Sequence, residues 1–522
     1  MMKIQRKYFI FLTLLLLVIV SACGGEDNEE NTNAEESEND GELKVALQGI
    51  PPSLDPHTTG STMTMEIARP IFETLVSYDS EHEIQPMLAE EWDVSDDQTK
   101  INFKLREGVK FHNGDEMKAE DVVASMNRWG ELHETSQRIL GDFEFEEVDD
   151  YEVVMNLEEP SFVALNILAI PPQYPAIMPK DIIEESDEEG VEEYIGTGPF
   201  KLKDYVSDQN IEFEKYDEYQ PVEGEQDGLA GEKEALVDTL FIDFVEDDST
   251  RVSSLMAGEY NISSSLPYDN YEEMDMDENV KPYTFEAGTD YIVFNKKKGP
   301  FSDKDARQGI LAGLDNESLS LGVYSDEEFF DLNPSLSLEE QVDWYTEEGS
   351  DLYNQNDKEK AKELLDNSEY DGEEITILTS DNTSHYDTAI SLQQQLEEMG
   401  VQAKIDSYEF ATALEHRDDP DNWDIYIVDL GTETLPINYL YFNPEWAGWT
   451  DSSEIEDAVE DIEHADNQEE ASKAAEELQE AFYDYVPVIK PSNRMVLEGT
   501  NGINELENFA NGDIFWGVSI ED

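Results

Sequence analysis

Cysteine and cationic side chains are what this sequence most lacks. One cysteine, Cys23, occurs in 522 residues, so no disulfide can form within the chain, and core packing and solvation must stabilise the fold. Lysine and arginine total 32 against 125 aspartates and glutamates, a formal net charge of −93. Because phosphate binding needs clustered cations, nucleic acid is not an expected partner. The acidic residues indicate a solvated surface that stays soluble in high salt, and a saline or alkaline habitat fits this composition.

Motifs for catalysis and metal binding are also missing. The sequence has no P-loop, HExxH or GxSxG pattern, so it is not the ATPase of a transporter, and no enzyme class is indicated. The seven histidines are dispersed, which is typical of surface or packing residues rather than ligands. Asp275, Asp277, Asn279 and Glu286 match ligand positions of a calcium loop, but Val280 stands where its turn needs glycine. No metal or cofactor is therefore expected.

Length and patterning indicate a folded body of several domains. A chain of 522 residues suggests two to four domains. High charge and low apolar content can mean disorder, but aromatic residues make up 10% and many apolar segments are periodic.

The N-terminus has the pattern of an export signal. Lys3, Arg6 and Lys7 precede an apolar run that is shorter than the roughly 20 residues needed to span a bilayer. The sequence Val20-Ser21-Ala22-Cys23 resembles a bacterial lipobox, which implies that Cys23 becomes a lipidated first residue. Residues 23–42 are acidic and without hydrophobic periodicity, and are predicted to be a disordered tether.

Residues 86–128 read as strand, turn and helix. Ile101, Phe103 and Leu105 alternate with polar residues, Asn113-Gly114-Asp115 predicts a turn, and residues 119–129 carry one apolar helical face. The run LAEEW at 88–92, the stretch 103–114 and the segment Ala119-Glu120-Asp121-Val122 resemble the signature of the family 5 extracellular solute-binding proteins, the peptide and nickel binders of ABC importers. Gly196-Thr197-Gly198-Pro199-Phe200 resembles a second element of that family, where the chain re-enters its first domain.

The resemblance implies an α/β fold of the periplasmic-binding-protein-like II class, with two lobes around a ligand cleft. The first domain is expected to be discontinuous (43–80, 191–286 and 485–522), with domain II at 81–190 and domain III at 287–484. The clearest α/β unit lies at 357–430, where Asp357 and Asp387 are predicted to cap helices between strands at 375–379, 401–405 and 425–430. This order predicts parallel pairing. Residues 486–489 and 515–520 are predicted strands that complete the first domain.

Ligand-binding candidates follow from the strand at 425–430, because ligands of α/β folds bind beyond the carboxyl ends of strands. In the peptide binders that this chain resembles, an aspartate in this region holds the α-ammonium group of the ligand, usually close to an Asp-Pro pair that is missing here. Glu433 is the first candidate for that role and Asp429 the second; the alternative is that both only decorate an acidic loop. Trp446 and Trp449 are expected to wall the cavity or to belong to the core. Tyr291 and Asn295, where the chain crosses into its last lobe, are the remaining ligand-binding candidates.

The sequence thus predicts a monomeric, lipid-anchored binding protein on the outer side of the cell membrane. It would capture peptides by lobe closure and deliver them to an ABC permease and its ATPase subunits. Alternatives are the same fold binding a nickel chelate or an oligosaccharide, an extracellular peptidase or hydrolase, and a receptor for peptide signals.

Overall fold

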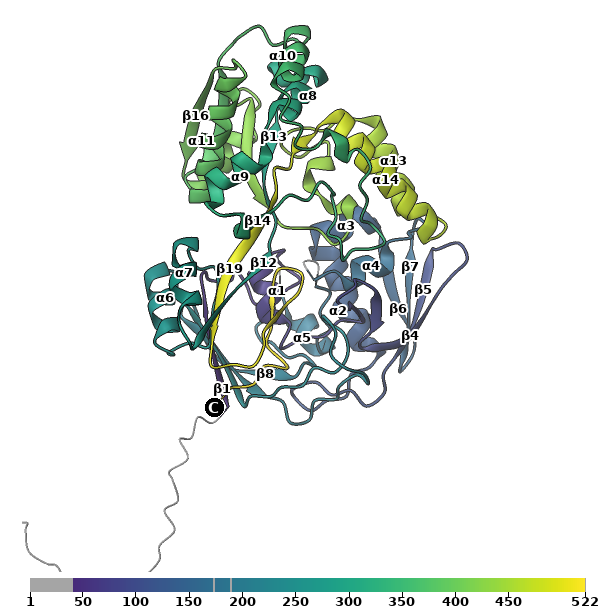
Figure 1. The fold of residues 1–522 in the computed structure, drawn as a ribbon. Coiled ribbons are helices and arrows are strands. Elements are labelled where there is room, and N and C mark those ends of the chain that lie inside the picture. Colours follow the sequence, from purple (N-terminus) through teal and green to yellow (C-terminus); the bar gives the residue numbers. More distant parts are fainter. Residues whose placement is uncertain (1–40, 172–173, 188–189, 522) are drawn as a thin grey trace, which may run out of the picture. The chain divides into compact units, whose positions relative to one another are not determined.

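The computed structural model describes residues 41–171, 174–187 and 190–521, which form two lobes joined by long strands (Figure 1). The first lobe contains an eight-stranded mixed sheet in the order β12-β19-β11-β1-β10-β9-β8, with β14 on the far part of β19. Its strands are β1 (Glu42–Leu47), β8 (Phe200–Val206), β9 (Asn210–Lys215), β10 (Thr239–Phe244), β11 (Ile262–Ser263), β12 (Val280–Glu286), β14 (Phe330–Asp331) and β19 (Asn493–Asn501). The predicted start of folded structure near Leu43 is confirmed.

A four-stranded antiparallel sheet in the order β4-β5-β7-β6 is the second part of this lobe. On β5, Ile101, Phe103 and Leu105 are buried and Lys104 is exposed, as the alternation predicted. The strands are β4 (Ala89–Val94), β5 (Lys100–Leu105), β6 (Phe143–Asp149) and β7 (Glu152–Leu157), and a small pair is formed by β2 (Val76–Tyr78) and β3 (Ile84–Pro86). The helices of the first lobe are α1 (Thr62–Ala68), α2 (Ala119–Leu132), α3 (Glu134–Leu140), α4 (Ala164–Ala169), α5 (Lys180–Glu185), α6 (Asp248–Met256) and α7 (Tyr271–Asp275).

The second lobe is built on a five-stranded sheet in the order β16-β15-β17-β13-β18. The predicted parallel pairing is confirmed, since β15 pairs parallel with both β16 and β17. The strands are β13 (Thr289–Phe294), β15 (Ile375–Ser380), β16 (Ala403–Tyr408), β17 (Ile425–Leu430) and β18 (Val488–Ile489). The helices are α8 (Lys304–Gly313), α9 (Asn316–Tyr324), α10 (Lys358–Asn367), α11 (Thr383–Glu398), α12 (Phe410–Arg417), α13 (Ser453–Glu463) and α14 (Gln468–Tyr485).

Three local predictions are wrong. Residues 515–520 do not form a strand, because only Ile520 pairs there, in an isolated bridge with Ile503. The strand expected at 486–489 does not complete the first lobe, because β18 pairs with β13 in the five-stranded sheet. Asp387 does not cap a helix: α11 begins at Thr383, and the side chain of Asn382 accepts a hydrogen bond from the Ser384 amide. The earlier start places His385 in the first turn of α11, where it is buried.

The calcium-like segment adopts a geometry that a calcium loop cannot have. Residues Val280–Glu286 form strand β12, which pairs along its length with β19. Within the described part of the chain no group of three or more acidic, histidine or cysteine side chains is arranged to hold a metal ion. In the same residues, none of the helices combines the length and the apolar character that crossing a bilayer requires.

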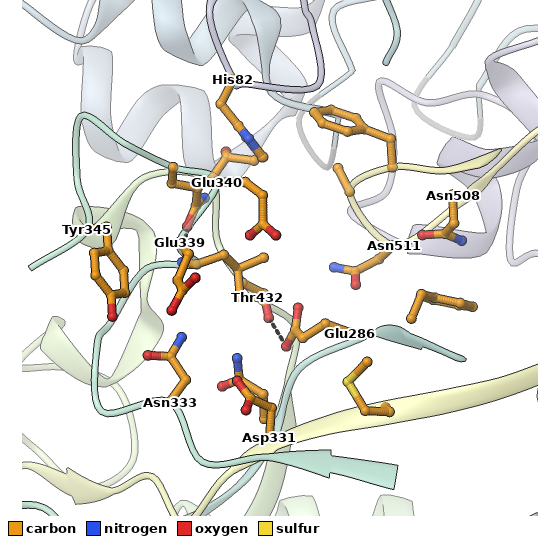
Figure 2. A pocket seen from close by; sticks show the side chains of 18 of the residues that line it. His82, Glu286, Asp331, Asn333, Glu339, Glu340, Tyr345, Thr432, Asn508 and Asn511 are labelled. Carbon is orange, nitrogen blue, oxygen red and sulfur yellow. Dashed lines mark hydrogen bonds between the residues drawn. The ribbon is translucent and has the colours of Figure 1, made fainter. Parts of the chain in front are cut away.

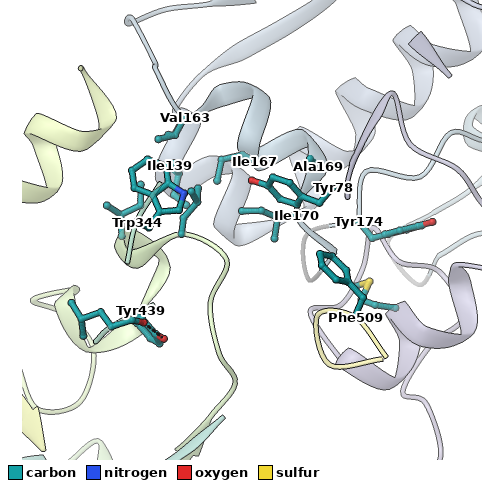
Figure 3. Packing of buried hydrophobic residues seen from close by; sticks show 14 of the residues in the cluster. Tyr78, Ile139, Val163, Ile167, Ala169, Ile170, Tyr174, Trp344, Tyr439 and Phe509 are labelled. Atoms are coloured by element: carbon teal, nitrogen blue, oxygen red, sulfur yellow. Dashed lines mark hydrogen bonds between the residues drawn. The ribbon is translucent and has the colours of Figure 1, made fainter. Parts of the chain in front are cut away.

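The lobes are connected at 287–288, between β12 and β13, and at 490–492, between β18 and β19. They also touch elsewhere, since the Phe162 amide donates to the Glu463 carbonyl at 2.8 Å and Gln98 Nε2 donates to the Ala465 carbonyl at 3.0 Å. One cluster of buried apolar side chains runs through both lobes; Figure 3 shows Ile139 and Val163 from the first and Trp344 and Tyr439 from the second. Near the C-terminus, the short strands β20 (Glu507–Asn508) and β21 (Asp513–Ile514) bring the chain back to the region between the two lobes.

Candidate ligand-binding site

A cavity of about 640 Å³ lies where the two lobes face each other, within the size range of small-molecule and peptide sites. Figure 2 shows side chains entering it from several separate segments. The first lobe contributes Ser80, His82, Asp331 and residues 507–511, and the second lobe contributes parts of 332–345 together with Thr432 and Thr434. The ends of β12 and β19 supply Phe285, Glu286, Asn493 and Met495.

Glu286 is the acidic side chain that links the connecting strand to the second lobe. Its Oε1 accepts a hydrogen bond from the Gly288 amide at 2.9 Å and another from the Thr432 hydroxyl (Figure 2). Burial raises the pKa of Glu286, although these two donors and the nearby charges of Lys490 and Arg494 act in the opposite direction. Both hydrogen bonds use Oε1, so Oε2 has no partner in the described protein. Glu286 therefore offers a carboxylate oxygen at the cavity wall.

The segment 331–345 is held in place by its own amide side chains. Asn333 accepts from the Ser335 amide at 2.7 Å and donates to the Ser337 carbonyl at 3.0 Å. Gln341 accepts from the Leu338 amide at 2.7 Å, and its Nε2 donates to the Glu433 carbonyl at 2.9 Å. Gln341 thereby ties this segment to the loop that carries Thr432 and Thr434, so the two walls are fixed together.

A tight turn between β20 and β21 forms another wall. Ala510 and Asn511 both have positive φ (47° and 59°), and the Phe509 amide donates to the Gly512 carbonyl, the geometry of a type I′ turn. Buried Arg69 of the first lobe donates to the carbonyls of Phe509, Ala510 and Gly512 at 2.9–3.0 Å. A Cβ on Gly512 would come within 2.7 Å of Arg69 Nη1, so a larger residue there would displace the guanidinium group from the turn. The clamped turn presents Asn511 to the cavity.

Two polar groups of the cavity wall lack hydrogen-bond partners within the described residues: the Thr434 hydroxyl and Nδ1 of His82. Thr434 is 5% exposed. Burial lowers the pKa of His82 to about 4, so its imidazole is neutral at neutral pH. Unpaired polar groups are costly in a folded protein unless a ligand or water completes them.

The predicted ammonium partners lie outside this wall. Glu433 stands between the two lining threonines, but its side chain faces Arg138 of α3, and neither Glu433 nor Asp429 is among the described residues that line the cavity. Burial raises the pKa of Glu433 to about 7, and the charge of Arg138 acts to lower it. An extended segment turns successive side chains to opposite sides, which explains why 432 and 434 reach the cavity and 433 does not.

Asp429 is already engaged by two side chains of the protein. Its Oδ1 lies 2.8 Å from His385 Nε2, and its Oδ2 lies 3.7 Å from Arg494 Nη2. Burial acts to raise the pKa of Asp429, but the hydrogen bond to His385 and the charge of Arg494 hold it below its usual value. A ligand ammonium group would have to compete with these partners.

The remaining candidates have packing contacts. Trp449 stacks on Trp423 with ring centroids 5.6 Å apart, and half-buried Trp446 packs against the main core. Tyr291 is buried against Tyr441, with centroids 5.1 Å apart. Asn295, fully buried, donates to the carbonyls of Pro420 and Trp423 at 2.8 Å. The roles of these four residues in ligand binding stay predictions.

Sequence reasoning missed Glu286 as a cavity residue, along with His82, Gln341 and Asn511. In the sequence Glu286 stands out only as the last position of the calcium-like pattern, and its partner Thr432 is 146 residues away in the chain. The one available signal was the alternation around Glu433, which places its two neighbours on the opposite side of the loop. Cys23 lies outside the described residues.

Comparison with known proteins agrees with this architecture. Residues 83–451 match the family model of the bacterial extracellular solute-binding proteins, family 5. A probable peptide ABC transporter periplasmic-binding protein of Sinorhizobium fredii is 28% identical over 87% of this chain and 88% of its own length. The oligopeptide-binding protein AppA of Bacillus subtilis is 25% identical over 91% of this chain and 92% of its own.

The solved structure of the oligopeptide-binding protein AppA of Bacillus subtilis in complex with a nonapeptide superposes with a TM-score of 0.72 at 21% identity, over 92% of this chain and 99% of that one. This likeness shows the fold, and it bears out the α/β class with two lobes that the sequence predicted. Since the family model spans well over half of the sequence, the chain belongs to the bacterial extracellular solute-binding proteins of family 5.

Proposed function

We propose that this chain is the substrate-binding lipoprotein of an ABC importer that captures peptides between its lobes and hands them to a membrane permease. The observation that carries the proposal is the cavity of about 640 Å³, whose walls come from both lobes and from the strands that join them. A ligand there touches both lobes at once, so its binding favours the closed arrangement that a permease can recognise. The relatives named as peptide-binding proteins support peptides as the solute class.

Glu286 is the proposed partner of the peptide's α-ammonium group. A charge enclosed between two lobes loses its hydration and needs an opposite charge. Glu286 lines the cavity and keeps Oε2 free of protein partners, whereas Asp429 is paired with His385 and Glu433 faces Arg138. An incoming ammonium group also favours the ionised form of Glu286, which burial alone disfavours.

Titration calorimetry with one peptide in free and N-acetylated forms tests the assignment. Glu286→Gln keeps the size of the side chain and can still accept from Gly288, but it removes the charge. We expect a loss of about 2–5 kcal/mol in binding free energy, which is roughly thirtyfold to several thousandfold in affinity. The acetylated peptide should bind the wild-type protein comparably poorly.

Glu433→Gln and Asp429→Asn are the matched controls, because each removes one carboxylate of the same loop region outside the cavity wall. Normal binding by both supports Glu286. A large loss in either, with Glu286→Gln unaffected, restores the assignment made from the sequence. Equal binding of both peptide forms to the wild-type protein excludes ammonium recognition and favours a non-peptide solute.

A nickel chelate is the second candidate solute, and one observation favours it: His82 lines the cavity with Nδ1 unpartnered among the described residues. An oligosaccharide is less favoured, because Trp446 and Trp449 do not belong to the described cavity wall. Calorimetry with nickel and free histidine, against peptide, separates the first two cases.

A hydrolase remains the alternative of another class. Ser380, His385 and Asp429 are hydrogen-bonded in series, at 2.7 and 2.8 Å, but Ser380 is 2% exposed and cannot reach a substrate. The family to which the chain belongs is one of solute-binding proteins. Incubation with a peptide library, followed by mass spectrometry, should show bound but intact peptides.

Lipid anchoring through Cys23 completes the proposal. Two acyl chains suffice for stable membrane attachment, whereas one is marginal. Cys23→Ala should move the protein from the membrane fraction to the medium, and Ser21→Thr, which keeps the cysteine, serves as the control. Unchanged membrane association of Cys23→Ala would refute the lipoprotein assignment.

A further inference from the structure

The wall of the cavity carries negative charge from five side chains. Glu286, Asp331, Glu339, Glu340 and Glu507 line it, and no lysine or arginine does so among the residues that the structure describes. They come from both lobes and from the connecting strand β12. Figure 2 labels Glu286, Asp331, Glu339 and Glu340 around the cavity.

Cations behind the wall compensate this charge only in part. Lys490 is buried, donates to the Ser335 carbonyl at 2.6 Å and acts to lower the pKa of Glu286, although burial lowers the pKa of Lys490 itself to about 8. Arg494 shares its charge with Asp290 and Asp429. His82 lines the cavity as a neutral imidazole.

The cavity wall also carries oxygen atoms that are free to accept a hydrogen bond from a ligand. Glu286 Oε2 has no partner, and the Thr434 hydroxyl, nine-tenths buried, has none either within the described chain. Glu339 and Glu340 are exposed, and no hydrogen bond occupies their carboxylates in this part of the structure. A single α-ammonium group would pair with one carboxylate and leave the other carboxylates without a cation.

We propose that the solute is a cationic peptide, one that carries lysine or arginine side chains in addition to its terminal ammonium group. The inference rests on the proposed function and narrows its substrate class. At physiological salt the screening length is about 8 Å, so charges within one cavity still act on each other. Acidic peptides are disfavoured twice, by repulsion from the wall and by the absence of a lining cation for their carboxylates.

Three pentapeptides with identical termini test charge selection: Ala-Lys-Ala-Lys-Ala, Ala-Leu-Ala-Leu-Ala and Ala-Glu-Ala-Glu-Ala. We expect the affinities measured by calorimetry in 0.1 M NaCl to fall in that order, with about tenfold or more between the first and the last. In 1 M NaCl the screening length is about 3 Å, and the difference should shrink.

Glu339→Gln combined with Glu340→Gln removes two charges from the wall without breaking a described hydrogen bond. Its ratio of lysine-peptide to glutamate-peptide affinity should fall by about threefold. The control is Glu363→Gln with Asp366→Asn, at exposed positions of α10. It removes the same number of negative charges from the protein but leaves the cavity intact.

The outcomes separate this inference from the proposed function. Equal affinity for the three peptides overturns charge selection and leaves peptide binding in place. An equal effect of both double variants shows that the field of the whole protein, not the cavity wall, selects the ligand, and this also overturns the inference. If the folded protein binds none of the three peptides, the proposed function fails and the inference fails with it.

Discussion

Asp55 and Asp513 are both buried aspartates of the first lobe, yet their surroundings are opposite. Asp55 forms a two-point ion pair with Arg128, at 2.6 and 3.3 Å, and also accepts from the amides of His57 and Val191. Burial acts to raise its pKa, but the hydrogen bonds and the charge of Arg128 lower it. This carboxylate is matched by a cation and stays ionised.

Asp513 belongs to a cluster with more carboxylates than cations. The Tyr283 hydroxyl donates to Glu498 at 2.5 Å and to Asp513 at 3.2 Å, and Asp513 Oδ2 has no hydrogen-bond partner in the described residues. Burial raises the pKa of Glu498 and Asp513, and it raises the pKa of Glu66 to about 8. Arg69 is the nearby cation, but its N–H groups donate to three backbone carbonyls and not to these carboxylates.

The contrast shows that the charge of a side chain is not set by its type. Glu66 of this cluster, with a pKa of about 8, is mostly protonated at neutral pH, so the formal charge of −93 overstates the charge of the folded chain. The cluster also lies directly behind the cavity, since Asn508, a lining residue, donates to Asp513 at 3.1 Å. The matched pair is structural, whereas the unmatched cluster makes the cavity region sensitive to pH.

Breaking the matched pair should give the largest effect. Arg128→Met leaves the Asp55 carboxylate buried without its cation, and we expect a loss of about 3–5 kcal/mol in the free energy of unfolding. Denaturant titration monitored by fluorescence measures it. Asp55→Asn combined with Arg128→Met should recover part of the loss, because the buried charge is then gone.

Lys180→Met is the control for Arg128→Met. It removes a cation that pairs with Glu120 at 3.2 Å at the surface, where ion pairs contribute about 0–1 kcal/mol. If Arg128→Met costs no more than Lys180→Met, the pair is not structural.

Glu66→Gln should produce a smaller effect that depends on pH. The pKa of Glu66 is about 8 in the folded protein and near 4.5 when unfolded, so the folded state binds more protons between these values. The contribution of protonated Glu66 to the free energy of unfolding is therefore fully present below about pH 4.5 and is lost as the pH rises through about 8. One such proton gives a slope of about 1.4 kcal/mol per pH unit.

The unfolding free energy of the wild-type protein minus that of Glu66→Gln should decrease from pH 6.5 through 7 and 7.5 to 8. Taking this difference cancels the contribution of His57, His82, His112 and His133, whose pKa values burial lowers to about 4 in the folded protein and which still bind protons in the unfolded protein near pH 6.5. Asp55→Asn should lower stability equally across the window, since Asp55 is ionised in both states. Parallel curves for wild type and Glu66→Gln would show that Glu66 does not hold a proton.

Much of the second lobe was predictable from sequence because its signals are local. Asp357 and Gly400 mark helix boundaries within one turn, and the strands at 375, 403 and 425 have continuous or alternating apolar patterns. Asp387 failed as a cap because Asn382 offers the same chemistry five residues earlier, and sequence alone could not rank them.

The site was harder because its residues meet only through the fold. Whether Glu433 or its neighbours face the cavity depends on the register of one extended loop, which Gln341 fixes from a distant segment. The prediction that residues 486–489 complete the first lobe failed for the same reason: β18 is two residues long, and its partner β13 lies nearly 200 residues earlier.

Salt should have the smallest effect and should act differently on the two kinds of acid. Exposed carboxylates dominate the 125 acidic residues, and their mutual repulsion destabilises the compact state. The screening length falls from about 10 Å at 0.1 M to about 3 Å at 1 M, so the melting temperature should rise by a few degrees between these NaCl concentrations. Surface pairs such as Lys118 with Asp150 weaken as well, but cations are too few to reverse the sign.

The Asp55–Arg128 pair is buried and hardly screened, so the cost of Arg128→Met should be the same at both concentrations. A flat melting temperature would mean that the exposed acids are spaced widely enough for repulsion to be negligible, and a cost of Arg128→Met that shrinks with salt would mean that the pair is not shielded from solvent.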